Sequence, residues 1–167
     1  MLPSVKKTLA PRGERITIKV PLTKDHLSVI GAITPNGELS YSIHKTSIKG
    51  WDVILFLTHL LKLFSDRLLV VWDGSPIHRK SEEVLLFLKQ VGTWHLHTEF
   101  FPFYAPDLNP TEGLWHQLKG NLAYIPFRNF EKLDLELRLA IMRVRSKPQL
   151  VQELFGQPKL DISEFKK

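Results

Sequence analysis

Residues 68–78 read LLVVWDGSPIH, and this stretch decides the fold class. Its apolar residues run without a break from Leu68 to Trp72, directly after a segment with helical periodicity. An unbroken apolar run in that position predicts a central strand that is buried on both faces. Asp73 follows at the end of the strand. Ligands of α/β sheets bind beyond the carboxyl ends of strands, so Asp73 is a candidate for a functional cleft.

Strands and helices alternate around this run. The periodicity predicts strands at Arg15–Val20, His26–Ile33, Glu38–His44 and His95–Phe101, and helices at 50–64, 80–90, 110–122 and Phe130–Arg145. Pro35-Asn36-Gly37 carries the Asn-Gly signal of a tight hairpin. A meander followed by alternating helices and strands is typical of an α/β domain with one mixed sheet. We expect one domain over residues 1–157 and a loose tail over 158–167.

Composition excludes several classes of protein. The 167 residues carry a net charge of +6, which indicates either a nucleic-acid partner or a merely basic soluble protein. Part of the basic excess lies at the amino end, in Lys6, Lys7, Arg12 and Arg15. The absence of cysteine excludes disulfide frameworks and cysteine–zinc sites. No apolar run is long enough to predict a membrane span, and the first residues do not resemble a secretory signal.

Asp73 and Glu112 are the candidate metal ligands, and each also has a structural interpretation. Asp73-Gly74 is a turn signal, although a helix rather than a pairing strand is expected next. Glu112 follows Asn109-Pro110 where a capping box would place it, so the local pattern alone favours a structural role. Together, two carboxylates on a strand end and a helix can share Mg²⁺ or Mn²⁺. Phosphoryl transfer by two such ions usually needs at least three carboxylates.

Two longer stretches carry a family resemblance. Residues 70–80, VVWDGSPIHRK, resemble the second-aspartate motif of insertion-sequence transposases of the mariner-like superfamily, which are DDE endonucleases. Residues 101–115, FPFYAPDLNPTEGLW, resemble the glutamate motif of the same family, and LAPRG at 9–13 and GAITPNG at 31–37 resemble its earlier strands. The resemblance covers most of residues 1–155. It implies a ribonuclease-H-like α/β fold, a mixed sheet flanked by helices.

The resemblance also implies an activity and a site. Asp73 and Glu112 would be the second and third acids of a triad that holds Mg²⁺ or Mn²⁺ for DNA strand cleavage and strand transfer. Transposon ends and target DNA are the implied partners, with a possible homodimer or a missing upstream half of the transposase, in a bacterial protein that is cytoplasmic and nucleoid-associated. The residues expected to contact DNA are Lys6, Lys7, Arg12, Arg15, His78, Arg79, Lys80 and Lys119. His78 and Arg79 have an alternative interpretation as solvated charges at a helix entry.

The first acid of the triad has no match in the chain. In the family it lies on a strand just before the segment that resembles Leu2-Pro3-Ser4, and Glu14, Asp25 and Asp52 do not match it. We therefore expect the first strand to be missing and the chain to be incomplete or inactive alone. It would be a truncated copy, the product of a gene split between frames, or a protein translated from an upstream start. Two other functions remain open: a non-catalytic DNA-binding or regulatory protein, and an unrelated ribonuclease-H-like nuclease.

Overall fold

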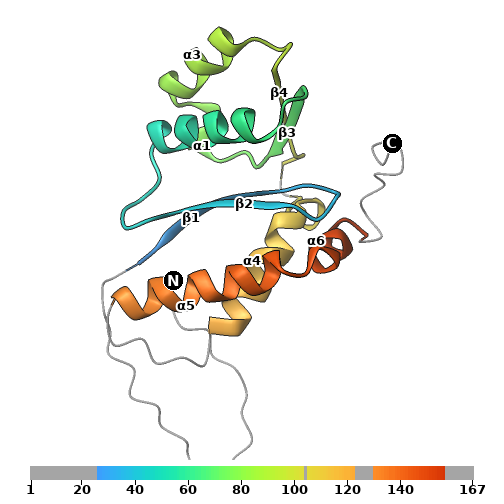
Figure 1. Cartoon of the computed structure of the whole chain (residues 1–167). Helices are drawn as coiled ribbons and strands as arrows, with labels where there is room; N and C mark the ends of the chain where they lie inside the picture. Colours follow the sequence, from blue (N-terminus) through green and yellow to red (C-terminus); the bar gives the residue numbers. More distant parts are fainter. Residues whose placement is uncertain (1–25, 104, 123–129, 157–167) are drawn as a thin grey trace, which may run out of the picture.

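The computed structural model describes residues 26–103, 105–122 and 130–156, and these form an α/β arrangement in layers (Figure 1). The strands are β1 (Ser28–Ile33), β2 (Leu39–His44), β3 (Leu68–Trp72) and β4 (Leu96–Phe100). The helices are α1 (Gly50–Leu63), α2 (Pro76–Arg79), α3 (Glu82–Val91), α4 (Pro110–Leu122), α5 (Phe130–Arg145) and α6 (Pro148–Phe155), with a 3-10 turn at Pro106–Leu108. The strand predicted at Arg15–Val20 and the tail at 158–167 lie outside the described residues.

The antiparallel hairpin of β1 and β2 forms the middle layer. Its loop is a turn in which the Gly37 amide donates to the Thr34 carbonyl at 2.9 Å, and the Thr34 amide donates to the Glu38 carbonyl at 3.0 Å. Gly37 has a φ of 91°, in the left-handed region that glycine adopts without strain. The predicted hairpin is therefore confirmed, with a three-residue loop of the kind that ends in a left-handed glycine.

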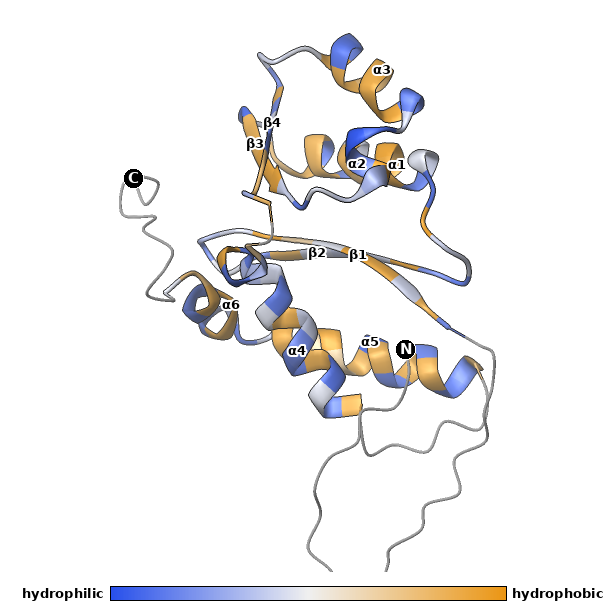
Figure 2. Cartoon of the chain, turned by 180° about the vertical axis from the view of Figure 1, so that it is seen from behind, coloured by the Kyte–Doolittle hydropathy of each residue, from blue (hydrophilic) through white to orange (hydrophobic). Residues whose placement is uncertain are grey.

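Helices cover both faces of this hairpin. Leu39 of β2 is buried among α4, α5 and α6, where Leu114, Leu137, Ile141 and other apolar residues form one core. Ile30 and Ala32 of β1 pack into a second core on the opposite face, built mainly by α1, α3 and β3. Figure 2 shows α4 and α5 beneath the hairpin, each with apolar stretches along its length, and both helices contribute buried leucines to the same core. Because successive side chains of a strand point to opposite faces, the hairpin contributes side chains to both cores.

The second sheet is the parallel pair β3 and β4, with Leu68 opposite Leu96 and Trp72 opposite Phe100. Val70 and Trp72 face α1 and α3, but Leu69 and Val71 remain 48% and 44% exposed on the other face. The prediction of a strand buried on both faces is therefore wrong for the described residues. An apolar run cannot reveal which face a helix covers, and among the described residues helices pack against one face of this sheet only.

Other expected elements match closely. The helix predicted at 50–64 is α1, and the strand at 68–72 and the helix at Phe130–Arg145 have the predicted bounds. The helix predicted at 80–90 is preceded by the short α2, and α6 was not predicted. The expected single mixed sheet is divided, within the described residues, into two two-stranded sheets. None of the described helices is long and apolar enough to cross a membrane.

Candidate active site

The parallel pairing of β3 and β4 gathers the candidate site at one edge of the sheet. The carboxyl ends of both strands lie side by side there, and the amide of Phe101 donates to the carbonyl of Trp72 at 3.0 Å. Asp73 leaves β3 at this edge, while the chain after Phe101 leads through the 3-10 turn into α4 and Glu112. Two carboxylates that are distant in sequence therefore reach one cleft.

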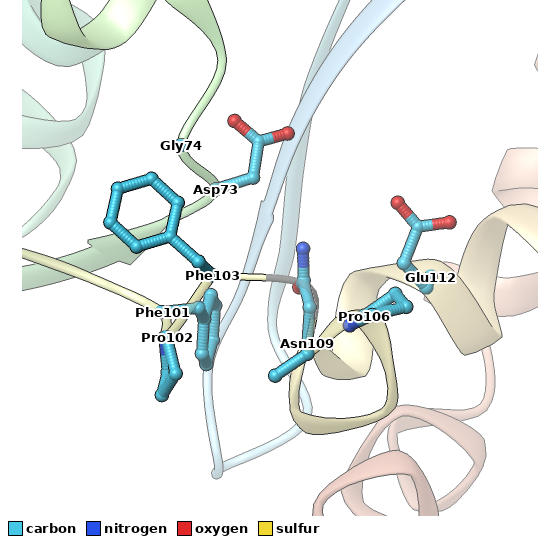
Figure 3. Close-up of a pocket in the computed structure, with 9 residues that line it drawn as sticks. Asp73, Gly74, Phe101, Pro102, Phe103, Pro106, Asn109 and Glu112 are labelled. Carbon is cyan, nitrogen blue, oxygen red and sulfur yellow. The ribbon is translucent and has the colours of Figure 1, made fainter.

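The cleft has a volume of about 260 Å³ and both carboxylates line it. Figure 3 shows the two carboxylates pointing to the same side, with Asn109 between their backbones. The other lining residues are Gly74, Phe101, Pro102, Phe103, Ala105, Pro106 and Asn109. Both acidic residues are exposed, which leaves their oxygen atoms accessible to a cation and its waters.

Asp73 is held by its own loop. Its Oδ1 accepts a hydrogen bond from the Ser75 amide at 3.0 Å and lies 2.8 Å from His78 Nδ1. Since an ionised carboxylate can only accept, His78 donates through Nδ1. The His78 side chain is only 16% exposed, against 55% for Asp73. The mostly buried His78 therefore holds Oδ1 of Asp73, and Oδ2 of the more exposed carboxylate is left directed outward.

A stacked series of rings supports this arrangement, and we call Trp72, His78, Phe100, Arg79 and Phe103 the ring column. The His78 ring lies parallel to Trp72, with centroids 4.6 Å apart, and Trp72 stacks on Phe100 at 5.8 Å. The Arg79 guanidinium lies 4.4 Å from the Phe100 centroid and 4.2 Å from that of Phe103. Cations favour such positions over aromatic faces. The ring column therefore connects His78, which contacts Asp73, to Phe103, which lines the cleft.

Glu112 does not make the capping box that its position suggested. The Asn109 side chain accepts from the Thr111 amide at 3.1 Å, so asparagine caps α4 as expected. The reciprocal half of a capping box needs the Asn109 amide to donate to Glu112, but that amide donates to the Pro106 carbonyl at 3.0 Å. In the described part of the chain no hydrogen bond engages the Glu112 carboxylate. Its place in the first turn of a capped helix therefore leaves it available to the cleft.

The donor set fits a hard divalent cation, but it is small. Carboxylate oxygens are ligands that Mg²⁺ and Mn²⁺ accept, and water completes the coordination in many such sites. Among residues 26–103, 105–122 and 130–156, no group of three or more acids, histidines or cysteines is placed to hold a metal ion. Asp52 serves α1 instead, since its Oδ2 accepts from the Lys49 amide at 2.8 Å. Glu14 and Asp25 lie outside the described residues.

The candidate DNA contacts divide between two elements near the cleft. His78 and Arg79 belong to α2, Lys80 ends it, and Lys119 is exposed on α4, two turns after Glu112. The cluster Lys6, Lys7, Arg12 and Arg15 lies outside the described residues. His78 and Arg79 are engaged in the ring column rather than extended into solvent.

Sequence reasoning missed Phe100 and Phe103, whose rings both lie against the Arg79 guanidinium. The aromatic run around Pro102 is a visible signal, yet nothing in it reveals that an arginine from α2 would lie over two of its rings. Trp115 of α4 packs against the core beneath the hairpin. It lies against Gly31 of β1, where a Cβ atom would be 2.8 Å from the indole ring.

Comparisons with known proteins give the family and the fold of the chain. A family model described as DDE superfamily endonuclease matches residues 3–134. The fold is similar to a crystal structure of the Mos1 mariner paired-end complex with Mn, with a TM-score of 0.65 and 16% identity over 93% of this chain. A Mos1 transposase paired-end complex with the left transposon end gives 0.59 and 15%, again over 93% of this chain. No curated protein matches. The predicted ribonuclease-H-like α/β class is confirmed by this likeness, and the chain spans 50% and 52% of the two Mos1 chains.

Proposed function

The chain belongs to the DDE superfamily of endonucleases, and we propose that it forms the metal-dependent catalytic core of a DNA transposase. The observation that carries this proposal is the convergence of Asp73 and Glu112 on one cleft at the carboxyl edge of a parallel strand pair. The likeness to DNA-bound Mos1 complexes supports DNA as the partner. The net charge of +6 favours the same polyanion.

In this proposal the two acids hold Mg²⁺ or Mn²⁺ beside a DNA phosphate. When bound, such ions activate the attacking oxygen and stabilise the leaving 3′ oxygen of an in-line displacement. Asp73 presents one carboxylate oxygen because Ser75 and His78 engage the other. Glu112 approaches from a capped helix that packs on the hairpin. Phosphates along the bound strand are neutralised by basic side chains, namely Lys80, Lys119 and the lysines and arginines of the amino-terminal segment.

We further propose that a third carboxylate arrives on a strand between β1 and β3. Each of these strands has a partner on one side, β2 and β4 respectively, and no described strand pairs with the other side. Ile30 and Ala32 of β1 share a core with Val70 and Trp72 of β3, which keeps the two sheets against the same helix α1. A strand inserted there would unite them into one mixed sheet and end beside Asp73. Without it, we expect weak metal binding and little cleavage.

Nicking of supercoiled plasmid with Mn²⁺ tests this function. The chain is compared with a version extended upstream by the proposed strand, and the Asp73→Asn and Glu112→Gln variants of the extended form are measured beside it. We expect nicking by the extended form only, and a loss of more than about 100-fold in either variant, because several kcal/mol of charge stabilisation disappear. Asp66→Asn, an exposed acid before β3, is the matched control and should leave nicking unchanged.

Each other outcome has a definite meaning. Asp73-dependent nicking by the unextended chain would overturn the proposed third strand but not the function. Nicking that ignores both acids would overturn the function. If the upstream-extended protein binds DNA but does not cut it, a non-catalytic DNA-binding protein is favoured. The described residues also suit that role, because they bring together two carboxylates and no third ligand.

A further inference from the structure

Phe103 is an exposed aromatic ring at the lip of the cleft. It lines the cleft together with Asp73 and Glu112, and 71% of it is exposed. Figure 3 shows it on the side of the cleft that carries Asp73 and Gly74. It takes part in neither of the two apolar cores. Core packing therefore does not explain where this ring is held.

Arg79 holds Phe103 in place. The guanidinium lies over the rings of both Phe100 and Phe103, at 4.4 Å and 4.2 Å from their centroids. Arg79 Nε is buried and has no hydrogen-bond partner in the described structure, so the stacking contacts dominate the surroundings of this group. Gly74 leaves room for it, because a Cβ atom there would lie 3.0 Å from Arg79 Nε. Phe103 therefore contacts the Arg79 guanidinium with part of its ring, and the rest of the ring lines the cleft.

We propose that Phe103 is a stacking platform for an unpaired nucleobase of the DNA strand whose phosphate lies between Asp73 and Glu112. The inference rests on the proposed function and adds a subsite to it. Every nucleobase has a π-face that can lie on an aromatic ring, with a further cation–π contribution from a nearby arginine. A base inside a duplex is already stacked on its neighbours, so only an unpaired nucleotide gains a new stacking contact from Phe103. The cleft would therefore prefer DNA with a single-stranded extension beside the reacting phosphate.

Binding to two DNA probes without divalent metal tests the subsite. One probe is a blunt hairpin duplex, and the other carries a short single-stranded extension that contains 2-aminopurine. We expect the full chain to bind the extended probe about 5- to 150-fold more tightly, the range of one base–aromatic stack, and to quench its 2-aminopurine fluorescence. Phe103→Ala should remove both effects. Phe103→Trp, which keeps an aromatic face, should restore them.

Trp94→Ala is the matched control. Trp94 is also an exposed ring, at 80%, and it lies 5.8 Å from the Arg67 guanidinium. It precedes β4 and Arg67 precedes β3, so this pair lies at the amino ends of the parallel strands, away from the cleft. Trp94→Ala should retain both the preference and the quenching. If it removes them as Phe103→Ala does, the subsite is not at Phe103.

The outcomes separate the two proposals. The subsite is overturned if the chain binds both probes equally or if the preference survives Phe103→Ala. Asp73-dependent plasmid nicking by the upstream-extended protein would still support the cleavage function. Quenching that depends on Phe103 without any Asp73-dependent nicking keeps the subsite and overturns the cleavage function. A chain that binds neither probe overturns the subsite, and plasmid nicking by the upstream-extended protein then decides the cleavage function separately.

Discussion

At the scale of single residues, the candidate site depends on how a carboxylate is oriented rather than on its presence alone. Asp73 has one oxygen engaged by Ser75 and His78, and the His78 ring is fixed on Trp72. Partners of this kind set the direction of a metal ligand and often matter nearly as much as the ligand. Glu112 has no comparable partner in the described structure, so its orientation depends on its helix.

His78→Ala should lower Mn²⁺ affinity and Mn²⁺-dependent nicking by the extended form by about 10- to 100-fold, because Asp73 loses the group that orients it. Metal titration and plasmid nicking measure the two effects. His97→Ala is the control, since His97 donates to Glu99 at 2.9 Å in a similar pair that does not line the cleft. Equal losses in the two variants would contradict a specific role for His78.

Residue types and spacing made Asp73 and Glu112 candidates for metal ligands, but they did not decide between the alternative roles of either residue. The capping box at Glu112 was the better local prediction, and it was wrong because the Asn109 amide finds the carbonyl of Pro106. That contact depends on the 3-10 turn before α4, which the prolines alone do not specify. The ring column was likewise invisible, since Arg79 and Phe100 meet only after β3 and β4 have paired.

At the scale of elements, the position of α4 decides where Glu112 lies. Trp115 on this helix packs on Gly31 of β1, the residue opposite Tyr41 in the hairpin. The close approach exists because glycine has no side chain. The elements themselves were largely predictable, because each has a clear period, but the helix-to-strand contact at Gly31 requires the tertiary arrangement.

Gly31→Ala should destabilise the fold by about 1–3 kcal/mol and displace α4, because the new Cβ would lie 2.8 Å from the rigid indole of Trp115. Urea unfolding measures the free energy. Gly92→Ala separates steric crowding from backbone strain. No atom of the described residues lies within 4 Å of its Cβ position, although its φ of 75° strains alanine. Combining Gly31→Ala with Trp115→Phe should recover part of the loss. No recovery would contradict the steric explanation.

At the scale of the whole molecule, two small sheets share a helical layer without sharing a hydrogen bond in the described residues. The Thr34–Glu38 bond fixes which β1 amides point toward β2. Since bonded residues alternate in an antiparallel pair, the amides of Val29, Gly31 and Ile33 point outward. The sequence could not reveal this division, because local patterns predict strands but not which strands pair.

The proposed strand between β1 and β3 should protect those three amides from hydrogen exchange. We expect slowing on the order of a hundredfold in the upstream-extended form relative to the chain alone, because exposed edge amides become paired. The amides of Ile30 and Ala32, which face β2, serve as internal controls and should change less. Equal exchange of Val29, Gly31 and Ile33 in the two forms would contradict insertion at this edge.

The central claim is that Asp73 and Glu112 bind the same divalent cation. Mn²⁺ titration followed by electron paramagnetic resonance tests it directly, on the chain and on Asp73→Asn, Glu112→Gln and the double variant. We predict that each single variant weakens Mn²⁺ binding about tenfold or more and that the double variant is little worse, because groups of one site are not additive. Asp66→Asn should have no effect. Independent losses that add in the double variant, or no loss in either single variant, would contradict a shared metal site.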